Sequence, residues 1–509
     1  MANRNFIPSS AILPILVVAL VGLLGLPARA QEKVVTMTFT AAWTTDNPYG
    51  YSSAETNAIF CQTYGCLGIW DYKNKKPVGV LAESWEWVND TTMRFKLRRD
   101  LKRHDGGPGV TSKDVIHSLN ITLNDKESLR RSFTRDIKEI REIDSHTFDM
   151  ITKAPAVDLI ISVFDSFIIT SAELWEKHGR AYYSKAPHGW GPYKLQEILV
   201  DDRAVMRKNT DWPGHHAKSP DVLIYRLVRE GEQRVNGLLN GEIQIARDIP
   251  PQSLPRLQNR KDIKIIRQPS IEQMFLLFNP SHKPWDDVRV RRAAALAIDR
   301  NLIVDRLLKG LAKPLQGWVN AEQICYTGPP DRPIAYDPKK ARELLDEAGY
   351  KGTGPAVEFY TSNGRYPSDR QIAEVVTQML GKVGFKVKLH TPEWANLFAD
   401  IQNGKTPLYY MGRGTVLDPG GPMITYIRSG ATKRSSYHNP ELDKLMDEQS
   451  VAFDEKKRCE ILRKANQIVL DDVPMLMMWS HEVVTGVREN IDIYVAPNSE
   501  VWHVDTRVN

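Results

Sequence analysis

Residues 287–310 are the stretch that most narrowly limits what this chain can fold into. Their apolar side chains recur at steps of three and four residues, with arginines and aspartates largely between them. That spacing is typical of a helix that buries one face. Asp286 or Asp287 can accept hydrogen bonds from the free N–H groups at the start, and Gly310 suits a C-terminal cap. The pattern therefore predicts one helix packed against a larger body.

The residues that follow alternate between helix and strand patterns. Asp337 and Pro338 are typical N-cap and first-turn residues, and Gly349 is a typical C-terminal residue of the helix between them. A strand over 357–360, a helix near 372–380 and a strand over 384–389 continue the alternation. Such alternation predicts a mostly parallel sheet covered by helices on both faces.

The N-terminus has the three parts of a secretory signal. Arg4 gives a positive start, residues 11–26 form an apolar run of 16 residues, and Ala28-Arg29-Ala30 is a small-residue cleavage site. A membrane anchor is the alternative, but the run is shorter than the roughly 20 residues needed to span a bilayer. We expect residues 1–30 to be removed. No Cys follows the apolar run, which argues against a lipoprotein.

Length and charge exclude some classes of protein. Without residues 1–30 the formal net charge falls from +6 to +4 over 479 residues, too small an excess for a nucleic-acid binder. A chain of this length should divide into at least two lobes. It contains no H-E-x-x-H, G-x-S-x-G or P-loop sequence, so we expect no enzyme, no catalytic residues and no cofactor.

The cysteine count is even, as expected of an oxidising compartment. Cys61 and Cys66 are close enough for a local bridge, which leaves Cys325 with Cys459, although three pairings are formally possible. A metal site is improbable because no second C-x-x-C or nearby His accompanies the pair.

Several motifs, in a fixed order, resemble one protein family. They are Leu81–Glu86 (LAESWE), Met93–Arg98, Leu101–Val115, Pro187–Tyr193 (PHGWGPY), Arg234–Ile243, Phe278–Asp287, Tyr437–Leu445 and Ala465–Leu476. Together they resemble the family 5 extracellular solute-binding proteins, the large peptide- and nickel-binding receptors of ABC importers. The resemblance covers essentially the whole mature sequence.

The resemblance implies an α/β, two-lobed periplasmic binding protein fold of type II in its large cluster C form. Lobe 1 would take residues 31–270 and 480–509, with an inserted subdomain at about 76–185, and lobe 2 residues 271–479. A monomer in the periplasm would capture a peptide or peptide-like molecule between the lobes and deliver it to inner-membrane permease subunits. A non-peptide ligand (an opine, an oligosaccharide or a nickel chelate) is the alternative, and a secreted hydrolase the least favoured.

Closure of two lobes on a ligand requires contacts from both. The expected ligand-binding residues are Trp43 and Trp190 from lobe 1, and Trp394, Met411, Arg413, Thr415, Asp418 and Trp479 from lobe 2.

The Gly-rich loop after residues 409–413 is the most informative of these segments. Peptide receptors of the family carry there an Asp, three residues before an acidic-Pro pair, that pairs with the ligand's amino group. In this chain the acidic-Pro pair is Asp418-Pro419, and Thr415 stands three residues before it. Arg413 could fork onto a ligand carboxylate. Alternatively, Arg413 and Asp418 pair with each other and brace the loop.

Overall fold

The structure is a computed structural model that describes residues 32–39, 47–50, 54–134, 136–164, 167–183, 185–414, 417–498 and 500–509. Lys33–Asn509 form one compact unit. Its α-helices are α1 Ala54–Thr63, α2 Ser112–Asn124, α3 Arg131–Thr134, α4 Leu159–Val163, α5 Ala172–His178, α6 Arg180–Tyr183, α7 Gly231–Asn240, α8 Leu254–Leu257, α9 Val288–Leu296, α10 Arg300–Arg306, α11 Pro338–Glu347, α12 Asp369–Val383, α13 Trp394–Gln402, α14 Gly420–Ile427, α15 Pro440–Ser450 and α16 Glu455–Asp472.

The strands are more numerous than the helices, and most of them are short. They are β1 Val34–Phe39, β2 Gly68–Asp71, β3 Lys76–Gly79, β4 Ala82–Asn89, β5 Thr92–Leu97, β6 Ile137–Asp144, β7 Thr147–Thr152, β8 Tyr193–Leu199, β9 Arg203–Lys208, β10 Val222–Leu227, β11 Ile245–Ala246, β12 Ile263–Pro269, β13 Gln273–Phe278, β14 Ala312–Pro314, β15 Ala356–Tyr360, β16 Lys386–His390, β17 Leu408–Arg413, β18 Met475–Arg488, β19 Ile491–Asp492 and β20 Arg507–Val508.

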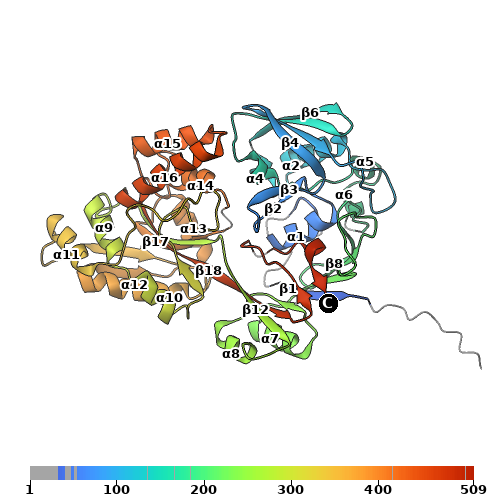
Figure 1. The fold of residues 1–509 in the computed structure, drawn as a ribbon. Helices are drawn as coiled ribbons and strands as arrows, with labels where there is room; N and C mark the ends of the chain where they lie inside the picture. Colours follow the sequence, from blue (N-terminus) through green and yellow to red (C-terminus); the bar gives the residue numbers. More distant parts are fainter. Residues whose placement is uncertain are drawn as a thin grey trace, which may run out of the picture. The chain divides into compact units, whose positions relative to one another are not determined.

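A 12-stranded sheet connects most of these strands, in the order β16-β15-β17-β13-β18-β11-β1-β10-β9-β8, with β12 and β14 paired to β18. Strand β18 pairs with β13 and β14 through its first half and with β11 and β12 through its second half. Figure 1 shows β12 and β18 running together between the two halves of the sheet. One strand therefore belongs to both halves.

The sheet is mixed, so the prediction of a mostly parallel second-lobe sheet was wrong. Strand β15 is parallel to β16 and β17, as the alternation predicted. Strand β17 is antiparallel to β13, and β13 is antiparallel to β18. Strand β13 pairs with a strand that lies more than 100 residues later in the chain, and no local pattern reports that pairing.

Residues 287–310 form two helices, α9 and α10, rather than the predicted single helix. Asp287 accepts a hydrogen bond from Arg289 N at 2.8 Å and is the N-cap, as predicted. The break comes at Asp299, whose carboxylate accepts from Leu302 N at 2.9 Å and caps α10. An Asp inside an apolar period can end one helix by capping the next.

Local signals elsewhere located the elements well. Asp337 accepts from Lys339 N at 3.1 Å and from Lys340 N at 2.9 Å, and Pro338 is the first residue of α11. Gly349 follows that helix with a φ of 91°, the left-handed region that glycine favours. The predicted strand, helix and strand that follow are β15, α12 and β16.

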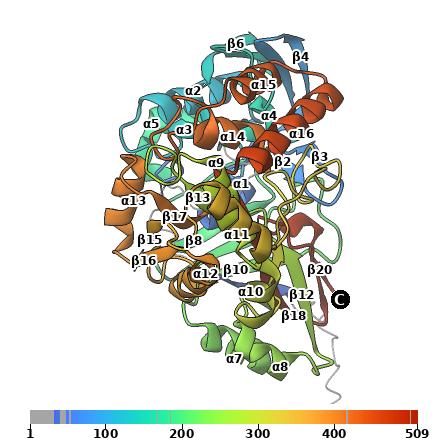
Figure 2. The same ribbon diagram turned by 90° about the vertical axis from the view of Figure 1, so that its left-hand side faces the viewer.

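Buried apolar side chains form three clusters. The C-terminal cluster, over 274–479, includes the sheet strands β13 and β17 and residues of α15 and α16, which lie side by side (Figure 2). The N-terminal cluster spans 35–245 and adds residues of 487–504. A small third cluster joins residues of 235–263 to Leu311 and Val484. No helix among the described residues is long and apolar enough to cross a bilayer.

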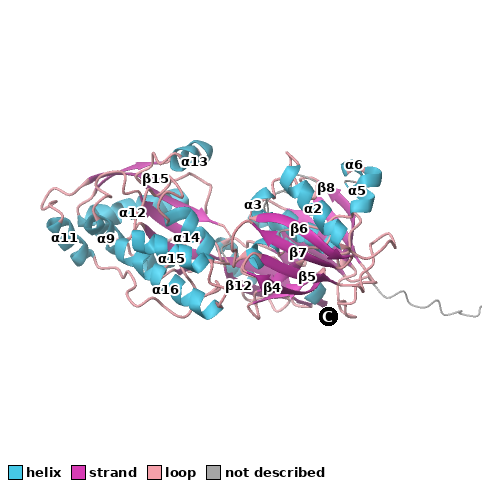
Figure 3. Cartoon of the chain, turned by 90° about the horizontal axis from the view of Figure 1, so that it is seen from above, coloured by secondary structure: helices cyan, strands magenta, loops and turns pink. Residues whose placement is uncertain are grey.

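A separate four-stranded sheet in the order β4-β5-β7-β6 lies within the N-terminal cluster. Helix α2 packs beside β6 (Figure 3). Thr111 is its N-cap, and the Asp114 carboxylate accepts from the Thr111 backbone N–H at 2.8 Å, completing a capping box. The sequence Thr-Ser-Lys-Asp at 111–114 is typical of a helix start with a capping box, and the structure confirms it.

Two disulfides constrain the chain over very different spans. Cys61 pairs with Cys66 at a sequence separation of 5, and Cys325 pairs with Cys459 at a separation of 134. The second bridge joins the segment after β14 to helix α16. In the chain-entropy account a bridge stabilises by limiting the unfolded chain, so the longer loop should contribute more.

Replacing both Cys325 and Cys459 by Ser should therefore lower the free energy of unfolding by about 2–5 kcal/mol. The matched double variant Cys61→Ser with Cys66→Ser should lose less, because its loop is short. Denaturant unfolding of the oxidised protein and both variants measures the difference. An equal loss in the two variants would contradict the entropic argument.

Candidate functional site: the loop after strand β17

The loop that follows β17 is held by contacts from distant parts of the chain. Ile324 N donates to Leu417 O at 3.1 Å, and the Trp318 indole N–H donates to Pro419 O at 3.2 Å. Gly420 N donates to the Asp418 carboxylate at 2.7 Å, where α14 begins. The loop is thus fixed by the segment between β14 and α11 and by its own Asp.

Asp418 makes a buried ion pair with Arg458 of α16. Arg458 Nη1 lies 2.8 Å from Asp418 Oδ2, and Nη2 donates to Oδ1 at 2.9 Å. The first contact is close but not aligned as a hydrogen bond, so the attraction there is between charges. Arg458 also donates to Gln449 Oε1 at 3.0 Å. The interpretation in which Asp418 pairs with Arg413 is therefore wrong.

Arg413 is left without an acidic partner among the described residues. Its guanidinium carbon lies 5.0 Å from the ring centre of Tyr426 and 5.9 Å from that of Trp318, which is cation–π distance. Its Nη1 is buried and has no hydrogen-bond partner. Burial, followed by the nearby charge of Arg434, lowers the pKa of Arg413 to about 10. This arrangement leaves a partly buried cation with no counterion in the part of the chain that the structure describes.

A second acidic residue, Asp158, approaches the Asp418–Arg458 pair from the segment before α4. A Cβ atom added to Gly421 would lie 3.4 Å from Asp158 Oδ2, which places the carboxylate at the start of α14. Burial, and then the charge of Asp418, raise the pKa of Asp158, while Arg458 opposes the shift. Asp158 and Arg458 also line one hollow of about 230 Å³.

The other predicted residues of the C-terminal half differ in exposure. Met411 and Trp479 are buried in the C-terminal cluster, and the Trp479 ring lies 6.0 Å from that of Tyr410. Trp394 is half-buried at the start of α13, with its ring 5.9 Å from Tyr366. Of these three, Trp394 has the most exposed side chain.

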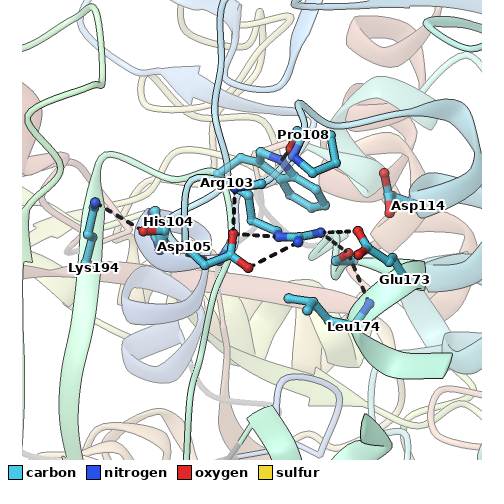
Figure 4. Close-up of polar contacts among 12 residues, drawn as sticks. Arg103, His104, Asp105, Pro108, Asp114, Glu173, Leu174 and Lys194 are labelled. Atoms are coloured by element: carbon cyan, nitrogen blue, oxygen red, sulfur yellow. Dashed lines mark hydrogen bonds and ion pairs between the residues drawn. The ribbon is translucent and has the colours of Figure 1, made fainter. Parts of the chain in front are cut away.

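Trp190 is a core residue of the N-terminal cluster. It is 1% exposed, and its indole N–H donates to Pro108 O at 2.9 Å. Nearby, Arg103 donates to Asp105 Oδ1 and Glu173 Oε2, both at 2.9 Å, as Figure 4 shows. Trp190 thus packs in the N-terminal cluster, and it also lines a hollow together with Arg103 and Glu173, so its contact with a ligand stays a prediction.

Trp43 and Thr415 lie outside the described residues. Among those that the structure does describe, no group of three or more His, Cys, Asp or Glu side chains could hold a metal ion.

Sequence reasoning missed the residues that surround Arg413 and Asp418. Trp318, Tyr426 and Arg458 come from three separate segments and meet the loop only in the fold. Nothing in their sequence context marks them, because each lies 13 to 95 residues from its partner. Only the loop after β17 carried a sequence signal, in its glycines and in the acidic-Pro pair Asp418-Pro419.

Comparison with known proteins identifies the family. The model of the bacterial extracellular solute-binding proteins, family 5 (Middle) matches residues 76–435. The dipeptide-binding protein of Escherichia coli (strain K12) is 24% identical over 490 residues, covering 88% of this chain and 89% of that protein. The glutathione-binding protein GsiB of Salmonella choleraesuis (strain SC-B67) is 25% identical over 481 residues, covering 91% and 92%.

The fold agrees with this match. HbpA2 from Haemophilus parasuis superposes with a TM-score of 0.86 at 20% identity, covering 94% of this chain and all of that one. The chain has the two-lobed periplasmic binding protein fold. It belongs to the bacterial extracellular solute-binding proteins of family 5.

Proposed function

We propose that this protein is the substrate-binding component of an ABC importer. It captures a peptide or peptide-like small molecule between two lobes, in the periplasm, and delivers it unchanged to permease subunits. Membership of family 5 carries this proposal, since relatives along nearly the whole chain are named for binding dipeptides and glutathione. Solved structures with this fold also include complexes with agropinic acid and with Ni(L-His), which keeps a non-peptide ligand as the second candidate.

The chain passes from one proposed lobe to the other at two places, and these two crossings support a hinge between the lobes. The first is the end of β12 and the residues after it, and the second is the middle of β18. They lie side by side, because Ser270 N donates to His481 O at 2.9 Å. We place the lobe boundaries at 270/271 and 479/480, so that lobe 2 contains the C-terminal cluster. Rotation about two adjacent crossings would leave the packing within each lobe unchanged.

Arg413 supports a ligand with a carboxylate. Asp418 is already paired with Arg458, and the described residues offer Arg413 only aromatic faces. A buried charge without a partner is costly, and a planar carboxylate can accept two parallel hydrogen bonds from a guanidinium. In this proposal Arg413 binds the ligand's carboxylate and Trp394 provides a ring against its apolar part. Trp43 and Thr415 remain proposed contacts.

Asp158 and α14 belong to different proposed lobes, so their contact supports a role for Asp158 in lobe closure. Asp158 falls in the proposed lobe 1, whereas Asp418 and Arg458 fall in lobe 2. The carboxylate thus meets both the favourable start of α14 and the like charge of Asp418. Repulsion by Asp418 and the cost of burial weaken this contact.

Arg413→Ala should lower ligand affinity more than tenfold while leaving the melting temperature near that of the native chain. Charge-assisted hydrogen bonds typically contribute about 1.5–3 kcal/mol, and 1.4 kcal/mol is about tenfold. Mass spectrometry of the molecule that copurifies with the protein identifies the ligand, and calorimetric titration measures its affinity. Recovery of that molecule with its mass unchanged after prolonged incubation is the result expected of a binding protein.

Arg434→Ala is the matched control, because Arg434 also lies over Tyr426, at 5.3 Å, but donates to Gln402. It should change affinity much less. A loss of thermal stability in Arg413→Ala comparable to its loss of affinity would instead favour a bracing role for Arg413.

Ordinary dipeptides and tripeptides with free amines should not raise the melting temperature. Thr415 stands where peptide receptors of the family place an Asp, and a buried ammonium without a carboxylate costs several kcal/mol. A thermal-shift screen of free-amine peptides and their N-acetylated forms checks this. Stabilisation by the free amines alone would overturn it, and Glu272, a carboxyl whose pKa burial raises, would then be the first residue to mutate.

Asp158→Asn should stabilise the protein at neutral pH. Because the pKa of Asp158 is raised in the folded state, folding binds its proton more tightly, and the charged form destabilises the fold. Its contribution to stability therefore falls as pH rises from the ordinary value of 3.8 through the raised folded value. The gain from Asn should be largest above that window and vanish below it.

Thermal unfolding between acidic and neutral pH measures this gain. Asp90→Asn, at an exposed aspartate, is the control and should change little. A lower melting temperature for Asp158→Asn at neutral pH would show that the charge of Asp158 is favourable.

A further inference from the structure

A separate cavity of about 250 Å³ lies between α1, the β2–β3 hairpin and residues of 494–498 and 500–505. Its lining shares no residue with the surroundings of Arg413. A binding site in this cavity would therefore be independent of the function proposed for the loop after β17.

Aromatic rings line much of this cavity: Trp70, Tyr72, Tyr494 and Trp502. The two tryptophans are half-buried, and Tyr494 is 41% exposed. Within the described part of the chain, neither Trp70 nor Trp502 stacks on another ring or donates its indole N–H to a protein group. Trp502 packs part of its surface against the N-terminal cluster, but both tryptophans keep exposed surface in the cavity lining, unlike the fully buried tryptophans of the core.

The charge in the cavity has one sign. Asp71 and Asp505 contribute carboxylates to the lining, and none of the described lining residues is Lys, Arg or His. Burial, and then the charge of Asp71, raise the pKa of Asp505, against the weaker pull of His216, Arg507 and Lys73 from outside the lining. Burial and the charges of Glu322 and Asp71 also raise the pKa of Tyr494. The cavity thus has a negative potential that a cation would relieve.

Its walls are tied together by the protein itself. The Gln62 side chain donates to Tyr225 OH at 2.8 Å and accepts from His503 N at 3.0 Å, which joins α1 to the C-terminal segment. The Cys61–Cys66 bridge restrains the end of α1 next to the hairpin. A ligand would therefore meet a largely formed site, which lowers the entropy lost on binding.

We propose that this cavity binds the cationic head of a small organic ammonium compound. Electron-rich ring faces attract cations, and quaternary ammonium groups are recognised by cages of such rings. The carboxylates add charge attraction, and the rings suit an alkylated ammonium better than a hydrated metal ion. The site lies on α1 and the C-terminal segment, so it is a second binding site of the receptor, distinct from that of Arg413.

Choline and its neutral isostere 3,3-dimethylbutan-1-ol test the proposal by calorimetric titration of the full chain. Choline should bind with a dissociation constant of about 1 mM or tighter, and the isostere at least about fivefold more weakly, as cation–π energies imply. Asp505→Asn and Trp502→Leu should each weaken choline binding by a similar factor. Arg413→Ala should leave it unchanged, and the transported ligand should still bind to Asp505→Asn.

The opposite results are equally clear. Equal binding of choline and the isostere, or no binding of choline at several millimolar, would overturn the proposal. So would tighter binding of a neutral sugar in the same titration. Loss of choline binding in Arg413→Ala would place the cation in the other site. If Trp502→Leu fails to fold, Asp505→Asn with its melting temperature retained still decides the question.

Discussion

The buried pair of Asp418 and Arg458 is the interaction on which the candidate site depends. Two charges taken out of water stabilise a fold only when the rest of their hydrogen-bonding capacity is satisfied. Here Gly420 N and Gln449 satisfy much of it. The Cys325–Cys459 bridge adjoins Arg458, and Ile324, next to Cys325, donates to Leu417 O. The disulfide thus joins the two segments that hold the loop, one by the hydrogen bond to Leu417 and the other by the ion pair with Asp418.

Because Asp418 is paired with Arg458, Arg413 has no acidic partner among the described residues. Trp318, whose ring faces Arg413, is itself held by two hydrogen bonds. Its indole N–H donates to Pro419 O, and its backbone carbonyl accepts from the Gln273 side-chain amide. Gln273 is in turn the register partner of Arg413 across β13 and β17. The guanidinium therefore lies on a well-held platform, and the ligand carboxylate proposed here would gain two hydrogen bonds without first ordering the side chain.

Sequence reasoning succeeded where a structure is decided within a few residues. The caps at Thr111, Asp287 and Asp337 are contacts between near neighbours in sequence, so their pattern reports them directly. It failed at Asp299, where the same chemistry competed with an apolar period, and at β13, whose neighbours are set by distant pairings. Arg458, 40 residues from Asp418, could not be found for the same reason.

The aromatic candidates show a further limit of sequence analysis, because the sequence does not distinguish a tryptophan in a core from a tryptophan in a pocket. Trp190 and Trp479 are both in buried clusters, whereas Trp70 and Trp502, which no motif singled out, are half-buried and line a cavity together with Asp71 and Asp505. What separates the two groups is the burial of the ring, which depends on segments far apart in sequence, α1 and 494–505 in this case. The second site is therefore proposed from ring burial and neighbouring carboxylates rather than from residue type.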